Sequence, residues 1–232
     1  MGDERNRTMT SEPVTIPVGK GSVSGLLQLP ADATALYVFA HGAGAGMAHP
    51  SMSTVADALA ARSIASLRYQ FPYMEQRQKR PDPPAVAHAA VRAAVAFAAA
   101  RTQLPLFAGG RSFGGRMTSQ AQAAAPFERV RGLIFFAFPL HPANKPARER
   151  AKHLADVTIP MLFLQGTRDA LAFLDELQPV VASLGARATL KLFENADHSF
   201  HVPARSGRTD AQVRGEMLDF VAAWIGSALT RG

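Results

Sequence analysis

Ser112 is the first residue in this sequence whose surroundings suggest chemistry. Gly110 and Gly114 flank it in the pattern G-x-S-x-G. This pattern turns a strand sharply into a helix and holds the serine in a strained, exposed position, where the tight turn leaves no room for neighbouring side chains. Chance alone gives roughly 0.08 such matches in a chain of this length, so the pattern gains weight only from its context. Here it lies between an apolar run and a segment of helical period, which is the context that a nucleophilic serine requires.

Two further polar groups follow apolar runs later in the chain. Asp169 comes after the run 161–164, and His198 comes after the run 189–193. A serine nucleophile needs an imidazole to take its proton and a carboxylate to orient that imidazole. Each residue alone would more often be a surface or capping residue. Together, in the order Ser, Asp, His, they predict a triad with Ser112 as nucleophile, His198 as base and Asp169 as acid.

Asp197 and His201 are the competing candidates for acid and base. We favour His198 because it comes first after its strand, whereas His201 lies near Pro203 and is expected to pack or cap. Asp197 is adjacent to His198, and the side chains of adjacent residues tend to diverge from their shared backbone. His198 and His201 have no third ligand close in sequence, so no metal is expected.

A glycine-rich loop, HGAGAG over residues 41–46, follows another apolar run. Backbone N–H groups in such a loop can stabilise a developing oxyanion together with the N–H that follows the nucleophile. The expected donors are Ala43 and Phe113, with Gly44 in reserve.

The glycines in this loop and those around Ser112 raise the alternative of a nucleotide-binding loop. Gly42 and Gly44 begin G-x-G-x-x-G, but Met47 occupies its last position. The glycines at 110 and 115 have the spacing of a phosphate-binding loop, but Arg116 and Met117 replace the required Lys and Ser or Thr. Both patterns fail, and no cofactor is expected.

Two arginines lie close to these segments. Arg68 follows the run that begins at Ile64, and Arg111 directly precedes Ser112. Their guanidinium groups are candidates for binding an anionic substrate through two parallel hydrogen bonds. The alternative is that each pairs with a nearby carboxylate and braces the edge of the sheet.

The elements that position these residues follow from the apolar pattern. Short apolar runs without alternation predict strands that are covered on both faces, and longer segments of helical period lie between them. The expected strands are 15–18 and 22–29, forming a hairpin, and then 36–40, 64–69, 105–108, 133–138, 161–164 and 189–193. The expected helices are 51–62, 83–101, 113–124, 147–154, 170–184 and 211–229.

This alternation predicts an α/β fold, a doubly wound and mostly parallel sheet with right-handed crossovers and helices on both faces. Asp82 suits the N-cap of the second helix and Pro83 its first turn. We expect a flexible segment over residues 1–12 and one domain over 13–232. Ligands bind at the carboxyl ends of the strands in such sheets, which is where all the candidate residues lie.

Composition limits the classes of partner. The formal net charge is +7, and residues 57–152 hold fifteen basic residues against five acidic ones. These charges are scattered singly, which favours a solvated face over a nucleic-acid or membrane surface. The chain has no cysteine, so it has no disulfide and no thiolate nucleophile. The polar start of the sequence and the lack of a long apolar stretch favour a cytoplasmic location.

The motifs together resemble the α/β-hydrolase superfamily from about Thr15 onward. The sequence is similar to small uncapped members near the dienelactone-hydrolase branch. Its segments Gly166–Asp169 and Asp197–Phe200 resemble those of bacterial relatives of the testis-expressed and NSL-complex hydrolase-like proteins. Dienelactone hydrolases use a cysteine nucleophile, which this chain lacks, so dienelactone substrates are not expected.

The resemblance implies a serine hydrolase that cleaves a small-molecule carboxylic ester through an acyl-enzyme. The segment from His141 to Ile159, where capped members insert a lid, has only nineteen residues, so we expect no large cap and a small or polar acyl group. Two alternatives remain open. The same triad serves acyl transfer or peptidase chemistry, and the scaffold also occurs in non-catalytic interaction modules. The oligomeric state does not follow from the sequence.

Overall fold

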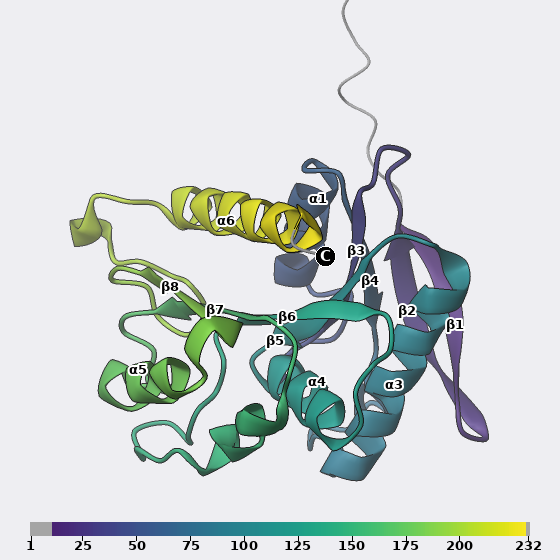
Figure 1. The fold of residues 1–232 in the computed structure, drawn as a ribbon, viewed down its shortest axis with the longest axis horizontal. Coiled ribbons are helices and arrows are strands. Elements are labelled where there is room, and N and C mark those ends of the chain that lie inside the picture. The colour runs from purple at the N-terminus through teal and green to yellow at the C-terminus, as the bar shows by residue number, and fades with distance from the viewer. Residues whose placement is uncertain (1–10, 231–232) are drawn as a thin grey trace, which may run out of the picture.

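A single eight-stranded sheet forms the centre of the molecule (Figure 1) in the computed structural model, which describes residues 11–230. The central strands coincide with the apolar runs because both of their faces are buried, whereas the edge strands Glu12–Val18 and Ala188–Phe193 are less buried. In chain order the strands are β1 (Glu12–Val18), β2 (Gly21–Gln28), β3 (Ala35–Ala40), β4 (Ile64–Tyr69), β5 (Leu106–Arg111), β6 (Val130–Phe136), β7 (Met161–Gly166) and β8 (Ala188–Phe193).

The spatial order of the strands is β1-β2-β4-β3-β5-β6-β7-β8. β1 and β2 form an antiparallel hairpin, β2 pairs antiparallel with β4, and every later pairing is parallel. The predicted doubly wound, mostly parallel sheet is confirmed. The chain winds in one direction from β3 to β4 and in the other from β5 onward, so a crevice opens beside the carboxyl ends of β3 and β5.

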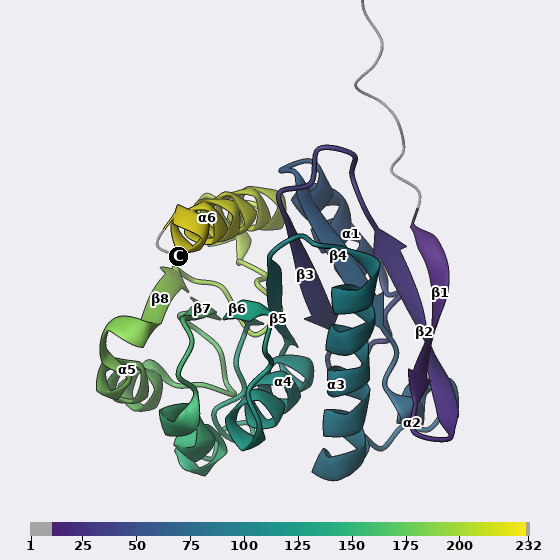
Figure 2. The same cartoon turned by 45° about the vertical axis from the view of Figure 1, so that its right-hand side comes forward.

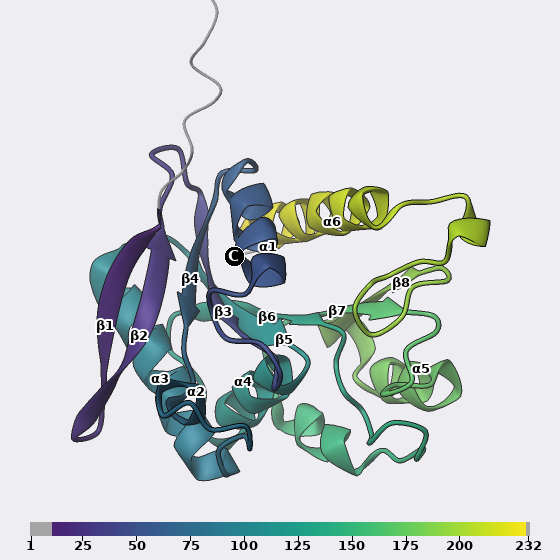
Figure 3. The same ribbon diagram turned by 180° about the vertical axis from the view of Figure 1, so that it is seen from behind.

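Helices cover both faces of the sheet (Figures 2 and 3). α1 and α6 lie on one face, and α3, α4 and α5 lie on the other. The α-helices are α1 (Pro50–Ala60), α2 (Pro72–Glu75), α3 (Pro84–Arg101), α4 (Phe113–Ala124), α5 (Leu174–Ser183) and α6 (Asp210–Thr230), and short 3₁₀ helices span Glu149–Asp156, Gly185–Arg187 and Ala204–Ser206. None of the helices in residues 11–230 has both the length and the apolar character needed to cross a membrane.

β3 shows how both faces are buried. Tyr37 and Phe39 belong to the core beneath α1 and α6, whereas Leu36 and Val38 belong to the core beneath α3 and α4. All four side chains are at most 1% exposed. This double burial explains why the sequence shows an unbroken apolar run here and not an alternating pattern.

Backbone hydrogen bonds continue from strand to strand beyond the regular ladder. In each of these bonds, the N–H of the first residue after one strand donates to a carbonyl near the carboxyl end of the neighbouring strand. The carboxyl ends of the strands therefore lie side by side. The bonds run from the Ser112 N–H to the Phe136 carbonyl (2.9 Å), from Ala137 to Leu164 (2.9 Å) and from Thr167 to Phe193 (3.1 Å).

Several elements differ from the sequence prediction, among them β6, which was expected over 133–138. β5 extends through Gly109 and Gly110 to Arg111, because these glycines serve as close-packed strand residues and not as a turn. A side chain at Gly109 would place its Cβ 1.9 Å from the Ile134 carbonyl oxygen. The helix expected from Ala170 begins only at Leu174. The predicted helix at 147–154 is a 3₁₀ helix, Glu149–Asp156.

The predicted Asp82 N-cap of α3 is wrong. Pro83 is the N-cap residue, and the Asp82 carboxylate instead accepts the Tyr73 N–H at 3.0 Å. It thereby anchors α2, a short helix that the sequence analysis missed. At the N-terminus, residues 1–10 of the expected flexible segment lie outside the described range, while Glu12 begins β1 and pairs with Leu27.

Candidate active site

Ser112 lies at the turn between β5 and α4, with backbone angles of φ 48° and ψ −117°. A positive φ is strained for any residue that carries a Cβ. The turn is crowded: a Cβ at Gly110 would lie 2.4 Å from the Ala40 carbonyl oxygen, and one at Gly114 would lie 2.5 Å from that of His41. The two glycines let β5 and α4 pass this close to β3, so the sharp turn holds the serine at the rim of the crevice.

The structure brings Ser112 together with His198 and Asp169. Ser112 Oγ lies 2.8 Å from Nε2 of His198, and Nδ1 of the same ring lies 2.7 Å from Oδ2 of Asp169. A carboxylate only accepts hydrogen bonds, so Nδ1 carries the proton and Nε2 is free to accept the serine hydroxyl. This is the tautomer in which an imidazole can act as a general base toward a serine.

The Asp169 carboxylate is buried, with 1% exposure, and its oxygens are fully engaged. Oδ2 accepts the side-chain amide of Gln165 at 2.5 Å as well as the imidazole of His198, and Oδ1 accepts the Leu171 N–H at 2.8 Å. Three donors on one buried carboxylate fix its orientation. The turn that supplies the Leu171 N–H replaces the helical start that was expected at Ala170.

The loops that carry Asp169 and His198 are joined directly. The Arg168 N–H donates to the Ala196 carbonyl at 2.9 Å, and the Asn195 N–H donates to Thr167 Oγ1 at 2.9 Å. Gly166 makes this approach possible, because a Cβ there would lie 2.3 Å from the Ala196 carbonyl oxygen. The acid and the base are therefore positioned relative to each other by backbone contacts and not only by their own side chains.

The two competing residues have other partners. Oδ1 of Asp197 accepts the N–H groups of Ser199 (2.7 Å) and His201 (3.0 Å), so this carboxylate shapes the loop around His198. Nδ1 of His201 lies 2.9 Å from the Asp210 carboxylate at the start of α6. That hydrogen bond raises the pKa of His201.

The loop after β3 and the start of α4 contain N–H groups that have no acceptor among residues 11–230. Phe113 begins α4, so its N–H has no acceptor within the helix. Within residues 11–230, the N–H groups of Ala43 and Gly44 donate no hydrogen bond to the protein either. The structure therefore leaves all three of the donors named from the sequence available to a ligand.

His41 and Tyr73 hold this loop in place. The His41 ring is buried, its Nδ1–H donates to the Gly42 carbonyl at 2.7 Å, and its Nε2 accepts the Phe71 N–H at 3.1 Å. Burial lowers the pKa of His41 to about 4, so the ring is neutral near pH 7. The Tyr73 hydroxyl donates to the Ala43 carbonyl at 2.8 Å, and burial raises its pKa to about 12.

The sequence analysis missed Gln165 and Tyr73 as parts of the site. Gln165 ends the apolar run of β7, where a polar residue facing the interior is itself a signal that a polar partner lies nearby. Tyr73 lies in the short helix α2, which was not predicted, and nothing in its local pattern places it beside the glycine loop.

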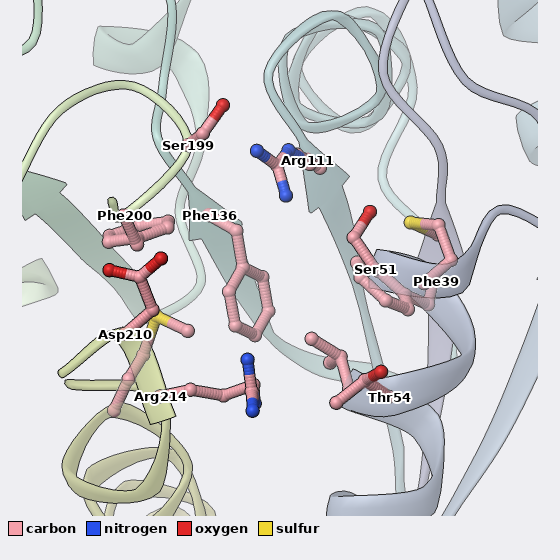
Figure 4. Close-up of a pocket in the computed structure, with 12 residues that line it drawn as sticks. Phe39, Ser51, Thr54, Arg111, Phe136, Ser199, Phe200, Asp210 and Arg214 are labelled. Carbon is pink, nitrogen blue, oxygen red and sulfur yellow. The ribbon is translucent and has the colours of Figure 1, made fainter. Parts of the chain in front are cut away.

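The two arginines named from the sequence have different surroundings. Arg68 is buried, and its guanidinium donates to the hydroxyls of Ser53 (2.7 Å) and Ser11 (2.9 Å) and to the Met47 carbonyl (3.3 Å). Its donors brace the protein itself, through hydroxyl and carbonyl groups and not through the carboxylate that was considered as an alternative. Arg111 lines a pocket whose other residues come from the sheet, α1, α6 and the loop after His198 (Figure 4), and burial lowers its pKa below the usual value for arginine.

Comparisons with known proteins agree with this architecture. A family model described as an alpha/beta hydrolase domain matches residues 33–226. A dienelactone hydrolase from Anabaena variabilis superposes with a TM-score of 0.76 at 21% identity, covering 94% of this chain and 97% of that one. A serine hydrolase homologue from Coxiella burnetii gives 0.73 at 21% identity, covering 90% and 96%.

A serine hydrolase without a lid from Xanthomonas campestris gives a TM-score of 0.71 at 22% identity, covering 93% of this chain and 95% of that one. Identities this low show the shared fold, and the family match spans most of the chain. The chain therefore belongs to the α/β-hydrolase superfamily.

Proposed function

We propose that this protein is a serine hydrolase that cleaves a carboxylic ester of a small or polar acyl group through an acyl-enzyme. The observation that carries the proposal is the continuous chain of hydrogen bonds from Ser112 Oγ through the His198 ring to Asp169. The superfamily supports hydrolase activity in general. The roles of the individual residues and the substrate class are the proposal.

In the acylation step, Ser112 Oγ attacks the ester carbonyl while Nε2 of His198 takes the hydroxyl proton. The tetrahedral oxyanion that forms accepts hydrogen bonds from the N–H groups of Phe113 and Ala43, with Gly44 as the reserve donor. His198 then gives its proton to the departing alkoxide as the bond to the acyl carbon breaks. Asp169 keeps the proton on Nδ1 and stabilises the imidazolium that exists between these transfers.

In the deacylation step, water attacks the acyl-enzyme. His198 takes a proton from the water and returns it to Ser112 Oγ as the acid leaves. Acyl transfer to another alcohol or an amide substrate would use the same groups, because the acylation step is shared. An ester is favoured for the proposal because resonance with nitrogen makes an amide carbonyl less reactive toward attack than an ester carbonyl.

The connection between β6 and β7 bears on the size of the substrate. It contains one short 3₁₀ helix, Glu149–Asp156, which packs against α4. No other regular element lies between β6 and β7, all of which the structure describes. A long acyl chain would find little apolar wall in an uncapped crevice, which supports a small or polar acyl group.

Covalent labelling tests the proposal before any natural substrate is known. The protein is treated with a fluorophosphonate probe, and hydrolysis of 4-nitrophenyl acetate is followed in parallel. We expect labelling that depends on Ser112, and we expect Ser112→Ala to lower hydrolysis by roughly 10⁴-fold with its fold unchanged. Activity of the variant within tenfold of the parent would place the nucleophile elsewhere.

The alternative reading is a non-catalytic interaction module, and the labelling experiment separates it from the enzyme. Such a module needs no reactive serine, so it would show neither labelling nor turnover while remaining folded. The expected cytoplasmic location stays a prediction, and cell fractionation checks it. The expected absence of nucleic-acid and membrane partners also stays a prediction.

A further inference from the structure

A pocket of about 120 Å³ lies between α1, α6 and the loop that follows His198. Its floor is apolar and is formed by side chains of the sheet and the helices, whereas two arginines reach into it from opposite ends (Figure 4). The volume suits a small group of several atoms and not a long chain. The walls include the aromatic side chains of Phe39, Phe136 and Phe200. The charged residues that line the pocket are Arg111, Arg214 and Asp210.

Neither guanidinium has a partner in the part of the chain that the structure describes. Arg111 and Arg214 make no hydrogen bond and no ion pair within residues 11–230, unlike the buried Arg68, whose two terminal nitrogens donate to hydroxyl and carbonyl groups. Both side chains are only partly exposed. A half-buried arginine whose donors are not satisfied by the protein is suited to an oxyanion that comes from outside.

Asp210 is the acidic group that lines the same pocket, and its oxygens are already engaged. Oδ2 pairs with Nδ1 of His201 at 2.9 Å, and Oδ1 accepts the Val202 N–H at 2.9 Å. Figure 4 shows the Arg214 guanidinium directed away from this carboxylate, although the two residues lie one helical turn apart. The pocket therefore carries two guanidinium groups without a hydrogen bond or ion pair among residues 11–230, although Arg214 interacts electrostatically with Asp210, and Arg111 with Asp197 and Asp169.

Two parts of the pocket's lining adjoin members of the proposed triad in the sequence. Arg111 directly precedes Ser112, and Ser199 and Phe200 directly follow His198. His198 protonates the leaving oxygen in the proposed mechanism, so the alcohol part of an ester lies on the side of the His198 loop. A group attached to that alcohol can extend into the pocket.

We propose that this pocket binds an anionic group, a carboxylate or a phosphate, carried by the alcohol part of the ester substrate, with Arg111 and Arg214 as its partners. The inference rests on the proposed hydrolase function and names its substrate class. It adds one specificity-determining residue, Arg214, that lies more than one hundred residues from Ser112 in the sequence.

A kinetic comparison tests the substrate class. The substrates are phenyl acetate, 4-acetoxybenzoate and 4-acetoxyphenyl phosphate, which share the acyl group and differ in the charge on the alcohol part. We expect kcat/KM to be higher for at least one of the two anionic substrates than for the neutral phenyl acetate. Comparison of the carboxylate substrate with the phosphate substrate shows which anion the pocket prefers. Arg214→Gln should reduce the ratio of anionic to neutral kcat/KM by about 10- to 100-fold, as expected for one charge-assisted hydrogen bond.

Arg205→Gln is the matched control. Arg205 is exposed on the 3₁₀ helix before α6 and does not line the pocket, yet its substitution lowers the net charge by the same amount. The ratio should stay unchanged in this variant. An equal loss in both variants would overturn the inference, because it would show that the general positive charge attracts the anion. Thermal unfolding of each variant shows that its fold is retained.

A binding measurement separates this inference from the proposed function. Titration calorimetry with 4-hydroxybenzoate, at constant ionic strength, should show binding that is lost in Arg214→Gln and kept in Arg205→Gln. Ser112-dependent hydrolysis of phenyl acetate with no preference for either anion would overturn the pocket's role and leave the hydrolase standing. Binding that depends on Arg214, with no ester turned over and no probe labelling, would support the anion pocket and overturn the hydrolase.

Discussion

His41 and His141 make the same pair of hydrogen bonds at the ends of two different strands. In each ring, Nδ1–H donates to the carbonyl of the next residue, at 2.7 Å for His41 and 2.8 Å for His141. In each ring, Nε2 accepts a backbone N–H from a distant segment, from Phe71 and Phe173 respectively, both at 3.1 Å. Two histidine rings thus tie the loops after β3 and β6 to the segments beside them.

The lowered pKa of the buried His41 ring predicts a loss of stability in acid. Its pKa is about 4 in the folded protein and about 6.5 in an unfolded chain. The unfolded state binds more protons between these values, so the free energy of unfolding falls as the pH drops from about 6.5 to about 4. Urea unfolding at pH 7.5 and 4.5 measures this loss, and His41→Asn should show a loss that is smaller by about 2 kcal/mol.

His153 titrates in the same range, since burial lowers its pKa to about 4 as well. For this reason the acid-induced loss in the free energy of unfolding is compared between the parent protein and the His41→Asn variant. The loss in the parent alone would include the contribution of His153. An equal acid-induced loss in the parent and in His41→Asn would show that His41 does not supply the effect.

Asp169→Asn should lower turnover by two to four orders of magnitude, because an amide at this position no longer fixes the proton on Nδ1 of His198. Asp197→Asn should cost far less than tenfold. An asparagine there keeps the side-chain oxygen that accepts the N–H groups of Ser199 and His201. Steady-state kinetics on 4-nitrophenyl acetate decides between them, and a larger loss in Asp197→Asn would reverse the assignment of the acid.

Gln165→Leu should lower kcat by roughly 10-fold, since the Asp169 carboxylate loses one of the two donors that fix Oδ2. Gln122→Leu is a control of the same size and burial, because Gln122 accepts the Phe127 N–H beyond the end of α4. Both variants should lose stability, but only Gln165→Leu should lose kcat beyond its folded fraction. Parallel losses of kcat would mean that Gln165 contributes only to folding.

Tyr73→Phe should lower kcat by roughly 10-fold with little change in KM, because the loop that carries Ala43 loses the hydroxyl that holds its carbonyl. Tyr37→Phe removes a similar buried bond, from the Tyr37 hydroxyl to the Ile134 carbonyl at 2.8 Å, within the core beneath α1 and α6. Its kcat should be unchanged in the folded protein. The same kinetic assay, together with thermal unfolding, distinguishes a loop effect from a general one.

Much of the fold follows from the sequence because the buried strands are continuous apolar runs. The runs after Pro30 each coincide with a strand, and the residues that follow them, Ser112, Asp169 and His198 among them, meet at one edge of the sheet. Parallel pairing alone brings successive carboxyl ends together, so the grouping of these residues needs no knowledge of individual contacts.

The parts that sequence reasoning missed depend on tertiary contacts. Gly109 and Gly110 look like a turn, but close packing against neighbouring strands makes them part of β5. Asp82 looks like an N-cap, but its carboxylate is held by the Tyr73 N–H. Arg111 and Arg214 line the same pocket because α6 packs over the sheet near the end of β5, and no local sequence pattern predicts this tertiary contact.

The backbone of Ser112 has an energetic consequence for the whole molecule. Its positive φ is a conformation that glycine adopts freely and that a residue with a Cβ adopts at a cost of about 1 kcal/mol or more. Ser112→Gly should therefore unfold at a higher urea concentration than Ser112→Ala, which keeps the Cβ and the strain. Both variants lack the hydroxyl, so the difference between them measures how much conformational stability the chain gives up to present a reactive side chain at this turn.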